Sequence, residues 1–210
     1  MHNPFTNTVK VVADLTGFEH EYVRLANEDK EDFKKNKYFA GSLPYLEDTA
    51  TGEGFGESVA IARFMCNSKP EAGLYGSSAY ETSKIDEVID GFMSNANNHG
   101  VKILYATLGF AKLDEETYKT QSKNWKDYLR LLNGRLDGKE YLVGDKLSLA
   151  DVYVAVSLNL FFATSLDAGF RKAIPHLTKW YESVRNNEAI VKHLGKPRFA
   201  GKGIKPQIAK

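Results

Sequence analysis

The spacing of apolar residues divides the first third of the chain into short elements of alternating type. Helical spacing predicts a helix over Asn7–Leu15, ended by Thr16-Gly17, and strict alternation predicts a short strand over His20–Leu25. The pattern then predicts a short charged helix or loop over Asn27–Lys37, a strand over Leu43–Leu46, a very short strand at Phe55 and a helix over Ser58–Asn67. We therefore expect a small α/β domain over residues 1–68.

A change of composition separates this part from the rest of the chain. Residues 69–80 contain Pro70, Gly73, Gly76 and paired serines, which is typical of a linker between domains. The helical period then returns and persists, and Val152–Ala163 is apolar almost throughout, as expected of a central buried helix. We expect an all-helical domain over residues 81–195, so the predicted fold class is α/β followed by all-α.

The last stretch, residues 196–210, is basic and rich in glycine and proline. It contains no acidic residue, and its cationic residues are Lys196, Arg198, Lys202, Lys205 and Lys210. We predict a basic flexible tail, with a solvated terminus that has no role as the alternative.

Composition excludes several classes of function. Hydrophobic residues make up 42% of the 210 positions, and the net charge is +1, so no global field would recruit nucleic acid or a membrane surface. No apolar run is long enough to cross a bilayer, and the first residues lack the pattern of a secretory signal, so we predict a cytoplasmic protein. The five histidines show no metal-ligand spacing, and Cys66 is expected in the core, so we predict no metal site.

The Leu-Pro pair at residues 43 and 44 interrupts a predicted strand. Proline cannot donate a hydrogen bond within a sheet, so Pro44 is tolerable only at the start of that strand. A sharp turn there would leave the N–H and C=O of Leu43 free to pair with an extended peptide ligand. The sequence alone favours a trans bond, since most bonds before proline are trans.

Glu57-Ser58 stands where a helix is predicted to begin. The backbone N–H groups and a serine hydroxyl at a helix N-terminus form a site suited to a carboxylate. Taken by itself, the pair is better explained by capping of the helix than by a ligand site.

Ser148 and Asp151 precede the central apolar helix at the spacing of a capping box. Together they can satisfy N–H groups that the helix leaves unpaired inside a core. We therefore assign Ser148 and Asp151 to structural capping, and we expect loss of Asp151 to lower stability.

The order of these motifs resembles that of the soluble glutathione transferases. The resemblance covers about residues 5–195 and implies a thioredoxin-like N-terminal domain followed by an all-helical C-terminal domain. It implies that Pro44 is the cis-proline of the glutathione site and that Leu43 hydrogen-bonds the cysteinyl backbone of glutathione. It further implies that Glu57 and Ser58 hold the γ-glutamyl carboxylate, so glutathione is the expected ligand or substrate and no other cofactor is expected.

Two later segments resemble the gamma-subunit family of eukaryotic translation elongation factor 1 in particular. These are Tyr141–Asp145, which leads into Leu147–Asp151, and Phe170–Tyr181, which combines an arginine, a proline and a Lys-Trp-Tyr run. The resemblance implies a scaffold module that docks the nucleotide-exchange subunit and carries a degraded glutathione site. A homodimer is a further expectation, and no direct contact to nucleic acid or membrane is expected. The alternative is an active transferase that conjugates glutathione to electrophiles.

The residue that would activate the thiol is the point of departure from an active transferase. Alignment on Lys10-Val11 places Phe5 where a serine hydroxyl is expected, and phenylalanine has no hydroxyl. Thr6 is the candidate substitute, although its β-branch crowds the hydroxyl. A thioredoxin-like oxidoreductase is excluded because the chain has no Cys-x-x-Cys pair.

Overall fold

A computed structural model describes residues 3–209, so the outermost residues of the predicted ranges 1–68 and 196–210 lie outside it. The chain begins with helix α1 (Pro4–Thr16), which extends one turn before the predicted start. Asn3 caps it by accepting a hydrogen bond from the Phe5 N–H at 2.9 Å. Gly17 ends the helix in the left-handed conformation with φ of 65°, as the Thr16-Gly17 pair predicted.

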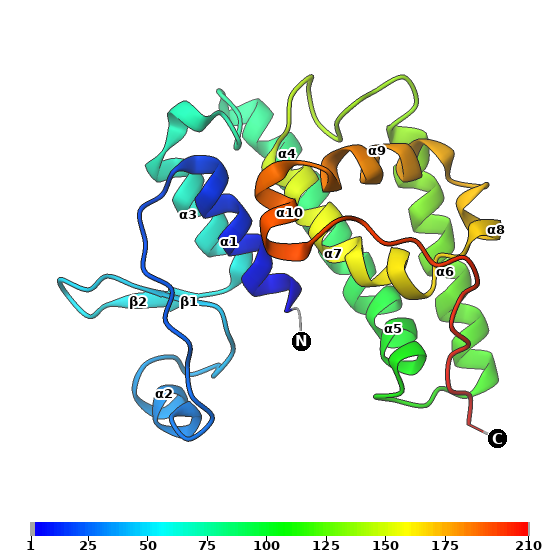
Figure 1. Cartoon of the computed structure of the whole chain (residues 1–210), viewed down its shortest axis with the longest axis horizontal. Helices are drawn as coiled ribbons and strands as arrows, with labels where there is room; N and C mark the ends of the chain where they lie inside the picture. The colour runs from blue at the N-terminus through cyan, green and yellow to red at the C-terminus, as the bar shows by residue number, and fades with distance from the viewer. Residues whose placement is uncertain (1–2, 210) are drawn as a thin grey trace.

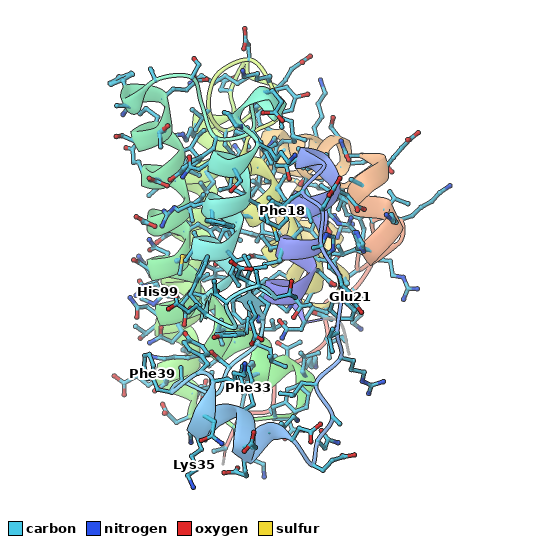
Figure 2. The ribbon with its side chains drawn as sticks, turned by 90° about the vertical axis from the view of Figure 1, so that its left-hand side faces the viewer. Phe18, Glu21, Phe33, Lys35, Phe39 and His99 are labelled. Atoms are coloured by element: carbon cyan, nitrogen blue, oxygen red, sulfur yellow. The ribbon has the colours of Figure 1, made fainter. Side chains whose placement is uncertain are left out.

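The prediction of a strand over His20–Leu25 is wrong. This segment is an irregular coil that runs past α1, where Figure 2 labels Glu21. In the described part of the chain the sheet has only two strands, β1 (Tyr45–Glu47) and β2 (Gly54–Gly56), which pair with each other. Within residues 3–209 no strand lies beside residues 20–25 to bond to them. Val23 is 75% exposed, so the alternation of apolar and polar residues does not bury one face.

The remaining elements of the first part follow the predicted order. Helix α2 (Lys30–Asn36) carries Phe33 edge-on against Tyr45 of β1, with ring centroids 5.3 Å apart, while Lys35 points away from the protein (Figure 2). Helix α3 (Ser58–Ser68) packs against α1. Its buried face includes Cys66, as predicted, and burial raises the pKa of that thiol to about 12, which leaves it unreactive.

The rest of the chain is helical, as predicted. After a short 3-10 turn, η1 (Pro70–Ala72), the helices are α4 (Ala79–Asn95), the π-helical turn η2 (Ala96–Gly100), α5 (Val101–Leu108), α6 (Glu115–Arg135), α7 (Leu149–Thr164), α8 (Ala168–Arg171), α9 (Pro175–Arg185) and α10 (Glu188–Leu194). Helix α7 lies at the centre and packs against α1, α4, α5 and α9 (Figure 1). It is buried nearly all round, which explains the unbroken apolar run.

Ser148 and Asp151 join the start of α7 to its surroundings. Asp151 is fully buried, and its carboxylate accepts from the Ser148 N–H at 3.0 Å and the Ser148 hydroxyl at 2.6 Å. It also accepts from the Leu142 N–H and from Trp180 Nε1, both at 2.8 Å. One side chain thus connects the loop before α7, the helix itself and α9.

The C-terminal segment is held against the helices, in contrast to the predicted flexible tail. The backbone N–H groups of Ala200 and Ile204 donate to carbonyl groups of α7, both at 2.8 Å. Gln207 and Ala209 then bond to Ala106 and Leu113. The segment crosses α7 and descends toward the end of α5 (red in Figure 1). Composition alone did not indicate these contacts, because backbone hydrogen bonds do not depend on residue type.

No helix among the described residues is long and apolar enough to cross a membrane.

Candidate functional site

A pocket of about 310 Å³ opens between the two parts of the chain. It brings together all four residues that the sequence assigned to a glutathione site, Leu43, Pro44, Glu57 and Ser58. The other residues that line it are Phe5, Ser42, Val59, Ala60, Arg63, Asp90, Met93 and Tyr153. Thr6 is not among the lining residues, and Ser148 and Asp151 lie elsewhere, at the start of α7.

Leu43 and Pro44 form one edge of the pocket. The peptide bond between them is cis, whereas the sequence alone favoured trans. Strand β1 begins only at Tyr45, so Leu43 lies outside the paired part of the sheet. Leu43 is 37% exposed and lines the pocket.

Glu57 and Ser58 form the second edge, at the N-terminus of α3. Ser58 is buried and its backbone N–H belongs to the first turn, where N–H groups lack partners within the helix. Glu57 has a φ of 69°, which is rare for a residue other than glycine and costs on the order of 1–3 kcal/mol. Such strain persists where the surroundings impose it, and here it turns the Glu57 side chain toward Tyr38.

Tyr38, just after α2, supports Glu57. Its hydroxyl donates to Glu57 Oε1 at 3.1 Å. Its ring lies directly against Gly56, where an added Cβ would be only 2.3 Å from the Tyr38 ring. Gly56 is therefore required for this close approach, and it links the sheet to the position of the Glu57 carboxylate.

An ion-pair network that the sequence analysis missed joins α3 to α4 at the floor of the pocket. Arg63 donates to Asp86 at 2.9 Å and to Asp90 at 3.0 Å, and Tyr75 donates to the Asp86 carboxylate at 2.8 Å. Burial, reinforced by the Asp86 carboxylate, raises the pKa of Tyr75 to about 12, so its hydroxyl keeps the proton. The sequence did contain a signal for this network. The two aspartates are spaced by one helical turn, and Arg63 is a lone charged residue in a mostly apolar helix.

The electrostatic character of the pocket follows from these groups. Arg63 is already paired with the Asp86 and Asp90 carboxylates, so its positive charge does not neutralise Glu57. Glu57 therefore adds a negative charge at the rim of the pocket. A carboxylate can pair with an ammonium group, and the N-terminus of α3 can hold an anion. The pocket thus suits a ligand with both an ammonium and a carboxylate group at one end. No cluster of His, Cys, Asp and Glu that could hold a metal occurs within residues 3–209.

Comparison with known proteins defines the class. The N-terminal domain model of glutathione S-transferases matches residues 1–67, and the C-terminal domain model matches residues 93–188. The glutathione S-transferase-like protein LUC7 of a Fusarium species is 31% identical over 91% of this chain and 88% of its own length. The chain therefore belongs to the glutathione S-transferase family, and the predicted thioredoxin-like and all-helical fold class is confirmed.

The chain is also homologous to elongation factor 1-gamma proteins, as the sequence resemblance predicted. Elongation factor 1-gamma 1 of Oryza sativa subsp. japonica is 30% identical over 95% of this chain, which spans 48% of that relative's length. The GST-like domain of elongation factor 1-gamma from Saccharomyces cerevisiae superposes with a TM-score of 0.86 over 97% of this chain and 94% of that domain, at 16% identity. Glutathione transferase F2 of Populus trichocarpa superposes with a TM-score of 0.77 over 90% of this chain and 92% of its own chain, at 17% identity.

Proposed function

We propose that this chain is a scaffold and binding module of the translation elongation factor 1 complex that retains a glutathione site. The observation that supports this role is the similarity to elongation factor 1-gamma over 95% of the chain. The pocket is consistent with it, because Phe5 lines the wall where an active transferase would present a hydroxyl and Thr6 does not line the pocket. On this proposal the module docks the nucleotide-exchange subunit in the cytoplasm, with a homodimer as a further expectation.

Purified components test the scaffold role directly. The chain is mixed with the nucleotide-exchange subunit of elongation factor 1 from the same organism, and the mixture is examined by size-exclusion chromatography with light scattering. A stable complex is expected, and the same measurement on the chain alone gives its oligomeric state. Elution of two separate proteins at micromolar concentration would contradict the docking role.

The glutathione part of the proposal assigns each end of the pocket a partner. The Ser58 N–H and hydroxyl would hold the γ-glutamyl carboxylate, and the Glu57 carboxylate would pair with the neighbouring ammonium group. The backbone of Leu43 would bond the cysteinyl residue. We expect Glu57→Ala to abolish glutathione binding in calorimetric titration with little effect on stability, because Glu57 is exposed. Glu53→Ala, on the exposed hairpin, is the matched control. Unchanged binding by Glu57→Ala would show that the pocket is assigned wrongly.

An active transferase is the second candidate. It is favoured by the match to LUC7, which spans most of both chains, and by the four predicted residues that meet in one pocket. A conjugation assay with glutathione and a generic electrophile separates the candidates. Turnover well above the uncatalysed rate would establish transferase activity, and binding without turnover would leave the scaffold role.

A further inference from the structure

A further hydroxyl in the pocket comes from the second domain. Tyr153, on the second turn of the central helix α7, lines the pocket together with Leu43, Glu57 and Ser58. Only 4% of Tyr153 is exposed, and its ring is held edge-on against Phe92 with centroids 6.1 Å apart. Its position is therefore fixed by packing before any ligand binds.

The other hydroxyls that line the pocket are already engaged or assigned. The Ser42 hydroxyl bonds to the Tyr38 phenol, and Ser58 belongs to the N-terminus of α3, where the carboxylate is expected. Asp90 reaches the pocket from α4, but its carboxylate pairs with Arg63. Among the lining side chains, Tyr153 alone brings a hydroxyl from the helical domain to the pocket.

The hydroxyl of Tyr153 is suited to donate. Burial raises its pKa to about 12, and the Asp90 and Glu57 carboxylates act in the same direction, so it keeps its proton at working pH. Ser157, one turn further along α7, shares a side-chain hydrogen bond with the phenol and opposes the rise. Rotation of the O–H toward the pocket presents it to a ligand there.

We propose that Tyr153 donates a hydrogen bond to the sulfur of glutathione bound in this pocket, in the role that Phe5 cannot fill. The inference rests on the proposed glutathione site. When the cysteinyl residue lies along Leu43, its side chain projects into the volume that Tyr153 lines from the helical domain. The thiol loses its proton to solvent water, Tyr153 keeps its own proton, and the hydrogen bond stabilises the thiolate.

The consequence is a lower pKa for the bound thiol than for free glutathione. A hydrogen bond to a charged acceptor in a buried site is strong enough to raise the thiolate fraction about tenfold near pH 7. Because the rest of the ligand contacts other residues, removing this bond would change affinity much less than ionisation. Tyr153 is therefore expected to control the ionisation of the thiol, while other residues control the affinity for glutathione.

The test combines two measurements on the intact chain. Calorimetry measures the affinity for glutathione, and the ultraviolet absorbance of the thiolate across a pH titration gives the pKa of the bound thiol. The variant is Tyr153→Phe. The matched control is Tyr128→Phe, which removes a hydroxyl from another tyrosine that packs on Phe92 but does not line the pocket.

We expect wild type and Tyr128→Phe to bind glutathione with a lowered thiol pKa. Tyr153→Phe should bind within about threefold of wild type, with the thiol pKa returned toward its free value of about 8.5. A lowered thiol pKa in Tyr153→Phe, or its loss in Thr6→Val instead, would overturn the assignment. A wild-type chain that binds glutathione with an unshifted thiol would also overturn it, whereas no binding at all would refute the glutathione site itself.

Discussion

Replacement of Asp151 by alanine should be the most damaging single change outside the pocket. The substitution leaves three buried N–H donors without an acceptor, those of Leu142, Ser148 and Trp180. Each buried donor without a partner costs about 1–3 kcal/mol, which sums to about 3–9 kcal/mol. Loss of the carboxylate also removes its own desolvation cost, so we expect the lower part of that range, about 3–5 kcal/mol.

That magnitude can be measured as a melting temperature. For a chain of this length a loss of 1 kcal/mol lowers Tm by about 2–4 °C, so Asp151→Ala should melt about 6–20 °C below wild type. Thermal unfolding is followed by circular dichroism, with a urea titration to obtain the free energy of unfolding. Asp145→Ala, an exposed aspartate in the loop before α7, is the control and should lie within about 0.5 kcal/mol of wild type. Equal melting temperatures for the two variants would refute the role given to Asp151.

Three further predictions follow from other contacts. Lys192 holds the pKa of Asp14 below its ordinary value of 3.8. The ionised Asp14 carboxylate therefore stabilises the folded state above pH 3.8, and this stabilisation is lost as the pH falls through the pKa of the folded state. The urea midpoint of Asp14→Asn should lie below that of wild type near neutral pH, and the two midpoints should converge in acid. Gly56→Ala should displace the Tyr38 ring and weaken glutathione binding about three- to tenfold by calorimetry, because the support of the Glu57 carboxylate is lost. Phe199→Ala should lower the free energy of unfolding by about 1–3 kcal/mol in urea, because its ring packs against both α7 and α9.

Each of these has a clear contrary result. A difference in urea midpoint between Asp14→Asn and wild type that grows in acid would contradict the predicted direction of the pH dependence. Undiminished glutathione affinity in Gly56→Ala would show that Tyr38 does not position the pocket. Wild-type stability in Phe199→Ala would favour the flexible tail that the sequence predicted over the ordered segment in the structure.

Elements with a strong local period could be predicted from the sequence. The helix at the start of the chain, the apolar helix α7 and the cap at Asp151 are determined by residues close to one another, so spacing was enough. The strand over His20–Leu25 failed because a strand requires a partner, and the period of a segment does not reveal whether a neighbouring strand exists. The order in the C-terminal segment depends on backbone hydrogen bonds to distant helices and on the single Phe199 ring, and neither leaves a periodic pattern along the chain.

The candidate site was predictable only in part, for a related reason. Leu43-Pro44 and Glu57-Ser58 are local pairs, and their meeting in one pocket was implied by the order of the motifs. Tyr153 reaches the same pocket from a position far along the chain, in a helix where every other feature indicates burial in the core. Its proximity to Leu43 is a property of how the two domains pack, and no short-range pattern carries that information.

The central claim is that the pocket between the two domains binds glutathione, and nuclear magnetic resonance tests its location most directly. Unlabelled glutathione is titrated into the isotope-labelled chain, and the backbone amide shifts are mapped. We predict that the largest changes occur at Leu43, Glu57, Ser58 and their neighbours, and saturate together. Saturating changes confined to another region, such as the crevice between α5, α6 and the C-terminal segment, would contradict the account.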